Sequence, residues 1–105
     1  MDTGRDLSPG GRLTVRGAED GLATNDDVEL VDEQGDRWLA TVLTMAEIGR
    51  VMESYRSSGE CQSGAYFRVP DLVIVRDPNL AAVLDAFAEL HRTGEYRYEM
   101  TQLID

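Results

Sequence analysis

The stretch DVELVDEQGDRWLATVLTMAE, residues 27–47, predicts a β-hairpin that leads directly into a helix. Val28 and Leu30 alternate with acidic residues, DEQGD supplies a turn that contains glycine, and the returning strand is apolar on both faces. Such a strand is typical of the interior of a sheet. Thr44 then begins a helix as its N-cap, because Glu47 follows three residues later in the spacing of a capping box.

The rest of the chain alternates helices and strands. An apolar stripe at helical spacing predicts that the helix begun at Thr44 continues to Gly59. DLVIV (71–75) is an apolar run typical of a strand covered on both faces. A second helix begins at Pro78, with Asp77 as its cap, and ends at 93–94. The alternating EYRYEMTQLI (95–104) predicts a final strand.

The order β-β-α-β-α-β predicts an α+β fold, with a mixed sheet of four or five strands and two helices packed mainly on one face. Residues 12–105 form a single domain in this interpretation, and RLTVR (12–16) is an additional edge strand. Residues 1–11 are rich in glycine, proline and charge, so we expect a flexible N-terminal segment.

Acidic residues are concentrated in one part of the chain. The net charge is −10, and residues 18–36 contain eight acidic residues and no basic one. This surplus disfavours binding to nucleic acid and to anionic lipid, and it leaves a basic protein partner open. Solubility is the simpler interpretation of the same charges. The candidate partner-binding residues are Asp26, Asp27, Glu29, Asp32, Glu33, Asp36 and Tyr66.

The compartment follows from what the chain lacks. The N-terminal residues have no apolar core of a secretory signal, and no apolar run approaches the roughly 20 residues of a membrane helix. We therefore expect a cytoplasmic protein.

The connection SSGECQSGAYFRVP (57–70) is long for a small domain, and connections of that length are often functional. It contains the only cysteine, Cys61, which has no partner for an internal disulfide. A cysteine nucleophile needs a base, and the only histidine, His91, belongs to the second predicted helix without an orienting motif. We therefore expect Cys61 to be a structural residue that packs in the loop and has no catalytic role. The alternative is a ligand pocket or a reaction site made by Glu60, Cys61, Tyr66, Asp71 and His91.

No metal or cofactor is expected. One cysteine and one histidine fall short of the four ligands of a zinc site, and the acidic stretch lacks the spacing of a calcium loop.

Between Trp38 and Val75 the sequence resembles small uncharacterised bacterial proteins that carry a GExCxxGxYF-like loop, here GECQSGAYF. The matching positions are Thr44, Gly59, Glu60, Cys61, Gly64, Tyr66, Phe67, Asp71, Ile74 and Val75. Short acidic proteins of this kind look like immunity proteins, so the resemblance implies a protein that neutralises a toxin.

Two classes of function follow. The first is a non-catalytic protein that binds and masks a basic toxin or enzyme, with complementary charge speeding association. The second is a small-ligand-binding or cysteine-dependent enzyme domain that uses the 57–70 loop. A homodimer through the edge of the final predicted strand is compatible with either class.

Overall fold

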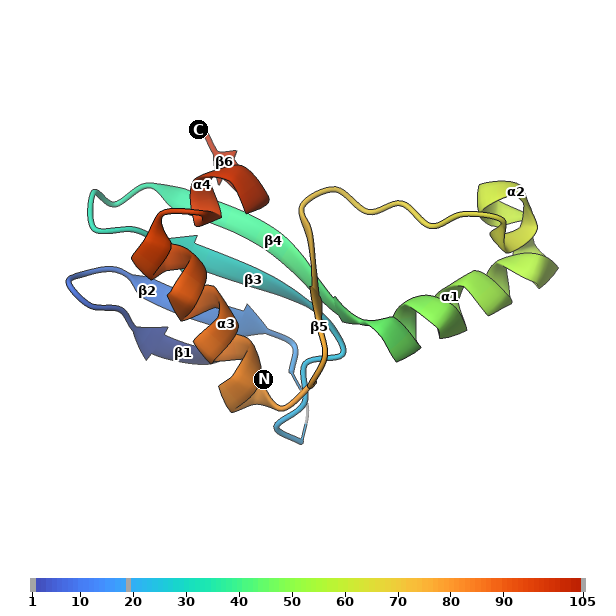
Figure 1. The fold of residues 1–105 in the computed structure, drawn as a ribbon, viewed down its shortest axis with the longest axis horizontal. Coiled ribbons are helices and arrows are strands. Elements are labelled where there is room, and N and C mark those ends of the chain that lie inside the picture. Colours follow the sequence, from blue (N-terminus) through green and yellow to red (C-terminus); the bar gives the residue numbers. More distant parts are fainter. Residues whose placement is uncertain (1, 19, 105) are drawn as a thin grey trace.

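The computed structural model describes residues 2–18 and 20–104. In these residues β1 (Thr3–Asp6), β2 (Arg12–Arg16), β3 (Asn25–Val31) and β4 (Arg37–Thr44) form an antiparallel meander (Figure 1). The second half of β4 pairs in parallel with β5 (Leu72–Val75), and its first half pairs antiparallel with β6 (Thr101–Leu103). Strand β4 is therefore the centre of a mixed sheet, with β3 on one side and both β5 and β6 on the other.

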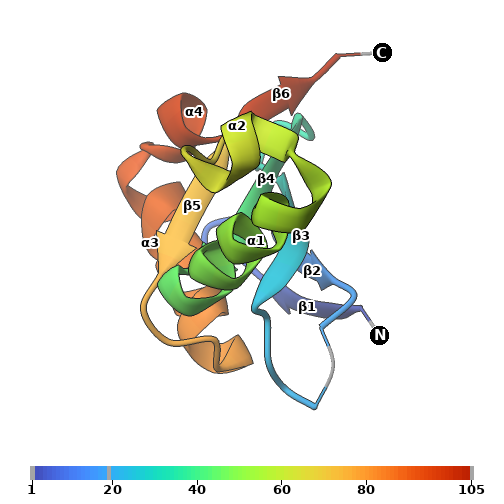
Figure 2. The same ribbon diagram turned by 90° about the vertical axis from the view of Figure 1, so that its right-hand side faces the viewer.

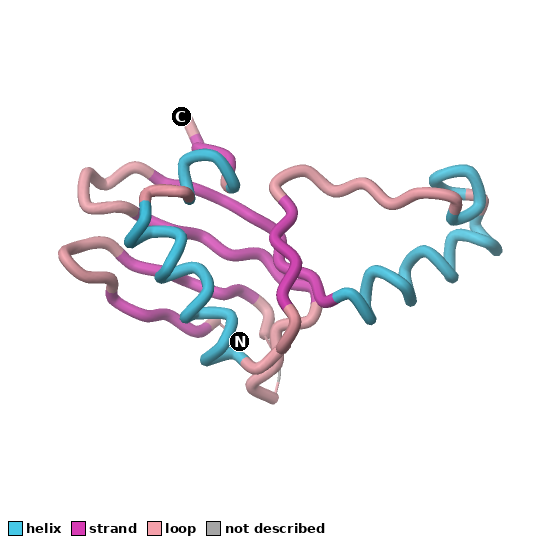
Figure 3. The backbone as a smooth tube through the Cα atoms, viewed as in Figure 1, coloured by secondary structure: helices cyan, strands magenta, loops and turns pink. Residues whose placement is uncertain are grey.

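One face of the sheet carries the hydrophobic core. Helix α3 (Leu80–Thr93) lies across this face (Figure 3). It buries Val83, Leu84, Phe87 and His91, and the core on the sheet side includes Leu13, Val15, Val28 and Leu30. The short helix α4 (Tyr96–Glu99) follows it and buries Tyr96. The alternating strands supply the apolar side chains on this face, as the sequence pattern predicts.

A projecting arm, residues 45–70, consists of α1 (Met45–Ser58), the turn α2 (Glu60–Gly64) and the return to β5. Helix α1 buries none of its residues and extends away from the sheet rather than back across it (Figures 1 and 2). The radius of gyration is accordingly 14.5 Å, against about 13 Å for a compact domain of this length. The arm makes the molecule elongated.

Local signals at the helix ends are confirmed. The hydroxyl of Thr44 accepts the backbone N–H of Glu47 at 3.1 Å, and Gly59 ends α1 with a left-handed backbone. Gly94 ends α3 in the same way. The N-cap of α3 is Asn79 rather than Asp77. The Asp77 carboxylate instead accepts the backbone N–H of Asn79 at 2.9 Å, in the turn that precedes the helix.

The α+β class is confirmed, but the number and order of strands differ from the prediction. The segment expected to be flexible contributes β1, which pairs along its length with β2 and is tied to α3 by an ion pair of 2.6 Å between Arg5 and Asp85. The sequence predicted that both helices pack on the sheet, but helix α1 does not. The order in the described residues is β-β-β-β-α-α-β-α-α-β.

The first half of the strand predicted over 95–104 is instead a helical turn, Tyr96–Glu99. Tyr96 and Met100 are both buried, and a spacing of four residues places two side chains on the same side of a helix as well as of a strand. Burial of Tyr96 beside Trp38 selects the helix, and only Thr101–Leu103 remain extended.

Two glycines of the arm test its conformation. A β-carbon at Gly64 would lie 2.4 Å from the carbonyl oxygen of Met52, and φ there is +90°. Gly64→Ala is therefore expected to destabilise the arm by about 1–3 kcal/mol. Apart from the adjacent residues and the backbone of α1 itself, no atom lies within 4 Å of a β-carbon at Gly49, so close packing does not explain that glycine. Gly49→Ala is expected to stabilise by roughly 1 kcal/mol. Amide hydrogen exchange in α1 measures both, and equal effects would contradict the arm geometry.

Candidate functional site

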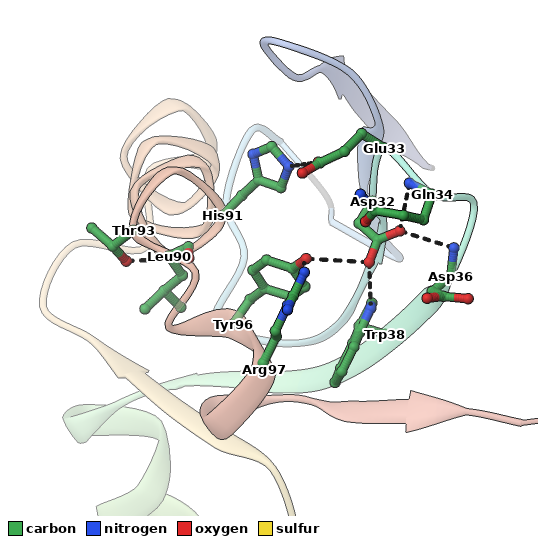
Figure 4. A network of polar contacts seen from close by, with 10 residues as sticks. All are labelled: Asp32, Glu33, Gln34, Asp36, Trp38, Leu90, His91, Thr93, Tyr96 and Arg97. Carbon is green, nitrogen blue, oxygen red and sulfur yellow. Dashed lines mark hydrogen bonds and ion pairs between the residues drawn. The ribbon is translucent and has the colours of Figure 1, made fainter.

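A buried polar cluster joins the β3–β4 turn to the C-terminal helices (Figure 4). Asp32 is 3% exposed. One of its carboxylate oxygens accepts the backbone N–H groups of Gln34 (3.0 Å) and Asp36 (2.9 Å). The other accepts Nε1–H of Trp38 (3.1 Å) and the hydroxyl of Tyr96 (3.2 Å). A single carboxylate thus holds the turn, β4 and α4 together.

Aromatic and charged groups surround Tyr96. The Trp38 ring meets it edge-on at a centroid distance of 5.2 Å, and the His91 ring stacks on it at 5.6 Å. The guanidinium of Arg97 lies 5.6 Å from the ring centroid, and its Nε–H donates to the hydroxyl at 3.3 Å. Nε2 of the buried His91 lies 2.7 Å from a carboxylate oxygen of Glu33. We call Asp32, Glu33, Trp38, His91, Tyr96 and Arg97 the Asp32 cluster.

Hydrogen bonding keeps the cluster's two carboxylates ionised. Burial alone raises the pKa of Asp32, but the donors from Asp36, Trp38, Gln34 and Tyr96 outweigh it and leave the pKa lowered. The hydrogen bond from His91 is the main cause that lowers the pKa of Glu33. Burial raises the pKa of Tyr96, so its hydroxyl keeps the proton that it donates.

The partners within the Asp32 cluster are mutually satisfied. No buried side-chain nitrogen or oxygen in the described part of the chain lacks a hydrogen-bond partner. A reacting group needs an unoccupied donor or acceptor that faces a substrate, whereas both oxygens of Asp32 are already engaged. The Asp32 cluster is therefore a hydrogen-bond network that stabilises the fold.

The five candidates for a ligand pocket lie in separate places. Cys61 and Glu60 are at the tip of the arm, and Tyr66 is exposed on its return. Asp71 is at the foot of the arm, where Thr101 donates to its carboxylate. His91 is at the C-terminal end of α3, at the opposite end of the molecule from α2 (Figure 1). The structure therefore does not bring the cysteine and the histidine together.

The tip of the arm has an unusual backbone. Cys61, Gln62 and Ser63 have φ values of 49°, 52° and 58°, so α2 is a left-handed turn built from consecutive residues with side chains. Each such residue costs about 1–2 kcal/mol relative to a right-handed turn. Gly59 and Gly64, at φ values of 83° and 90°, flank the turn and allow the chain to reverse there.

The acidic candidates also separate into groups. Asp26 and Asp27 lie at the start of β3, and Asp36 lies at the β3–β4 turn, roughly 20 Å away along the strand. Between them Glu29 pairs with Arg16 and, at 3.2 Å, with Arg37. Asp32 and Glu33 belong to the Asp32 cluster. We expected Asp32 to face a partner at the surface, but it is buried and has a structural role.

Two hollows lie near the start of β3. The acidic hollow, about 290 Å³, is lined by Gly17, Asp20, Leu22, Thr24, Asn25 and Asp26. The apolar groove, about 650 Å³, lies between the start of α1 and β5, and Met45, Ile74 and Pro78 contribute its apolar wall. Thr24 lines both hollows, so they adjoin.

Sequence reasoning missed the apolar members of these hollows. Leu22 is 45% exposed, Met45 75% and Ile74 54%. Met45 follows the N-cap Thr44, and the first turn of a projecting helix leaves such a side chain in solvent. Leu22 in the acidic loop gave no signal in the sequence, because a single exposed apolar residue is normal on a protein surface and only a contiguous patch marks a binding site.

No group of histidine, cysteine and carboxylate side chains suited to a metal ion occurs among the described residues. Within residues 2–18 and 20–104, none of the helices combines the length and apolar character needed to cross a membrane. Comparisons with protein-family models, curated proteins and solved structures found no match to this chain.

Removal of the central carboxylate tests the Asp32 cluster. Asp32→Ala leaves four donors without their acceptor and is expected to lower the free energy of unfolding by about 3 kcal/mol or more. Urea unfolding measures the loss. Asp36→Ala is the matched control, because its side chain is exposed and the expected change is within about 0.5 kcal/mol. Equal losses would show that Asp32 does not bind the cluster together.

The same two carboxylates contribute to the pH dependence of stability, together with Glu47 and Glu89, whose pKa values are lowered by hydrogen bonds from Arg50 and Arg92. Because the pKa values of Asp32 and Glu33 are lowered in the folded state, their stabilisation is complete above the unfolded-state values and is lost as the pH falls. We expect the free energy of unfolding to fall steeply below about pH 4. Urea titrations of Asp32→Asn should show a flatter fall, and an unchanged slope would contradict the assignment.

Proposed function

We propose that this protein is a small, acidic, non-catalytic binding protein that masks a basic protein partner, in the manner of an immunity protein that inhibits a toxin or enzyme. The acidic hollow is the observation that carries the proposal. It places the exposed Leu22 beside Asp20 and Asp26, which is the combination of apolar anchor and negative charge that a basic side chain with an aliphatic stem fits.

The loop that carries the hollow is held in place. Leu22 forms a β-bridge with Asn79, the N–H of Ala23 donates to the carbonyl of Pro78 at 2.8 Å, and the N–H of Leu80 donates to Gly21 at 2.8 Å. These bonds fix the loop to the start of α3. A binding surface that is already ordered loses less conformational entropy when a partner docks.

The neighbouring apolar groove supplies further anchoring surface. Met45 and Ile74 are exposed beside Thr24, which the groove shares with the hollow. Affinity at protein interfaces comes mostly from a few buried apolar or aromatic anchors, whereas surrounding charge raises the association rate. The carboxylates of the acidic hollow and the apolar wall of the groove together have this composition. The groove is also lined by Glu47, Arg50 and Arg76, so its contribution to the proposal is limited to its apolar wall.

The alternative, a cysteine-dependent enzyme or small-ligand domain using the 57–70 loop, has less support from the geometry. Cys61 lies at the arm tip and His91 lies beyond the sheet, so neither activates the other. A nucleophile requires such a partner within hydrogen-bond reach.

The test is an affinity pull-down from host lysate, in which captured proteins are identified by mass spectrometry at low and high salt. Asp20→Asn with Asp26→Asn removes two charges from the hollow, and asparagine tolerates the positive φ of Asp20. Asp36→Asn with Glu95→Gln removes two charges elsewhere and is the matched control. A basic partner that is lost only with the hollow variant, at unchanged stability, supports the proposal. Equal capture by all three proteins refutes it.

A further inference from the structure

The projecting arm connects two parts of the core that pack on each other. The meander β1–β4 precedes the arm, and the C-terminal unit, residues 71–104, follows it. The C-terminal unit packs on the meander through β5 and β6, which pair with β4, and through α3, which contacts β2. The main neighbours of α1 are α2 and β4, so the arm itself adds little to this packing (Figure 1).

The tip of the arm reverses the chain at an energetic cost. Cys61, Gln62 and Ser63 all have left-handed backbones. Gly64 approaches α1 so closely that no β-carbon fits between it and the carbonyl oxygen of Met52. A chain that did not reverse between residues 59 and 64 would release this strain. Strained hinges of this kind favour the exchange of whole elements between two copies of a protein.

Helix α1 also carries an apolar stripe that the described structure leaves incompletely covered. Ile48, Val51, Met52 and Tyr55 follow helical spacing, yet all four are only half-buried, and α1 has no buried residue. The turn α2 covers the end of the stripe, where Gly64 lies against Met52 and Tyr55. An apolar stripe on a helix normally faces a packing partner, so α1 has the pattern of a helix that packs on something further.

The stripe of α1 is complementary to itself. In an antiparallel pair of two α1 helices with a two-fold axis between Val51 and Met52, Val51 is level with Met52 of the other copy, and Ile48 is level with Tyr55. Each helix therefore offers apolar side chains where the other does. The charges of α1 are already neutralised within the helix by two i,i+3 ion pairs, so the pairing brings little like-charge repulsion.

We propose that two copies of this chain exchange their C-terminal units. Each arm opens at α2, residues 71–104 of each copy dock on the meander of the other, and the two α1 helices lie antiparallel between the two cores. The contacts between meander and C-terminal unit are kept, but they are made between chains. Interfaces of permanent homodimers resemble a domain core cut in half, and here the interface is the core itself.

The arm is long enough for this exchange. Helix α1 has 14 residues and is therefore about 21 Å long. Residues 60–70 span at most about 36 Å when extended. With the two α1 helices side by side, each helix ends near the other core, so residues 60–70 reach the site of β5 there. In the closed arm the same residues already run back along the length of α1 (Figure 1).

The exchange leaves the acidic hollow intact. The 20–24 loop is bonded to the residues that begin α3. In the exchanged dimer those residues belong to the other copy and make the same bonds. The dimer is therefore independent of the proposed binding of a basic partner, and each stands or fails without the other.

Refolding from urea at a series of protein concentrations, followed by size-exclusion chromatography with light scattering, tests the dimer. The wild-type chain should show the mass of two copies as the concentration rises. Gln62→Gly removes a left-handed side-chain residue from the closed arm, because glycine tolerates its φ of 52°. It should raise the dissociation constant of the dimer roughly 25-fold, about fivefold for each copy.

Two further variants separate hinge strain from a general effect of glycine. Ser57→Gly lies in α1, which both forms contain, and should leave the dissociation constant within about twofold of the wild-type value. Gly64→Ala strains the closed arm and should shift the chain towards the dimer.

A disulfide across the sheet distinguishes exchange from other dimers. In a Cys61→Ser background, Leu39→Cys and Thr101→Cys stand opposite each other on β4 and β6, at a Cα separation of about 4.5–5.5 Å that a disulfide spans. After oxidation of the dimer, a non-reducing denaturing gel should show two covalently joined chains. The monomer refolded at low concentration should show one chain. Arg37→Cys with Leu103→Cys repeats the test at a second opposed pair.

A chain that stays monomeric at every concentration overturns the proposal. So does a dimer in which both cysteine pairs form their disulfides within single chains, because its two copies would be closed. A dissociation constant that neither Gln62→Gly nor Gly64→Ala changes contradicts the role of the hinge.

Discussion

The fold depends on one buried carboxylate. Asp32 directly follows β3, accepts two backbone N–H groups of the turn into β4, and accepts hydrogen bonds from Trp38 and Tyr96, which lie far apart in the sequence. Burying a charge is costly, and only a full set of donors offsets that cost. Because those donors come from the turn, the central strand and α4, the carboxylate fixes where the C-terminal segment docks. The packing of α3 on the sheet has a separate basis in the apolar contacts of Val83, Leu84 and Phe87.

Local features of this fold could be predicted from the sequence, and features decided by distant partners could not. The hairpin, the cap at Thr44 and the glycine at the end of α1 depend on residues within a few positions of one another. The conformation of Tyr96–Glu99 depends on Trp38 and Asp32, because the spacing from Tyr96 to Met100 fits either a strand or a helix. Helix α1 buries none of its residues, although its apolar stripe is typical of a helix packed on a sheet, so its direction could not be predicted from the helical pattern.

The candidate site shows the same division. The density of acidic residues was visible in the sequence, but their distribution was not: Glu29 is neutralised by arginines on two neighbouring strands, and Asp32 is inside the protein. Alternation along β3 separates Asp26 from Asp27, and the length of the strand separates both from Asp36. Composition therefore indicated a charged protein, whereas the location of the acidic hollow depends on the contacts between the 20–24 loop and α3.

The central position of β4 has a consequence for synthesis of the chain. Its pairing with β3 uses neighbouring sequence, but β5 and β6 reach it only after the arm and α3 have been made. The first four strands therefore leave the ribosome as a meander whose central strand has an open apolar edge. Closure of that edge needs contacts of high sequence separation, which form slowly. We expect the nascent chain to be most prone to aggregation in this interval. The interval ends when β5 and β6 have been made and pair with β4.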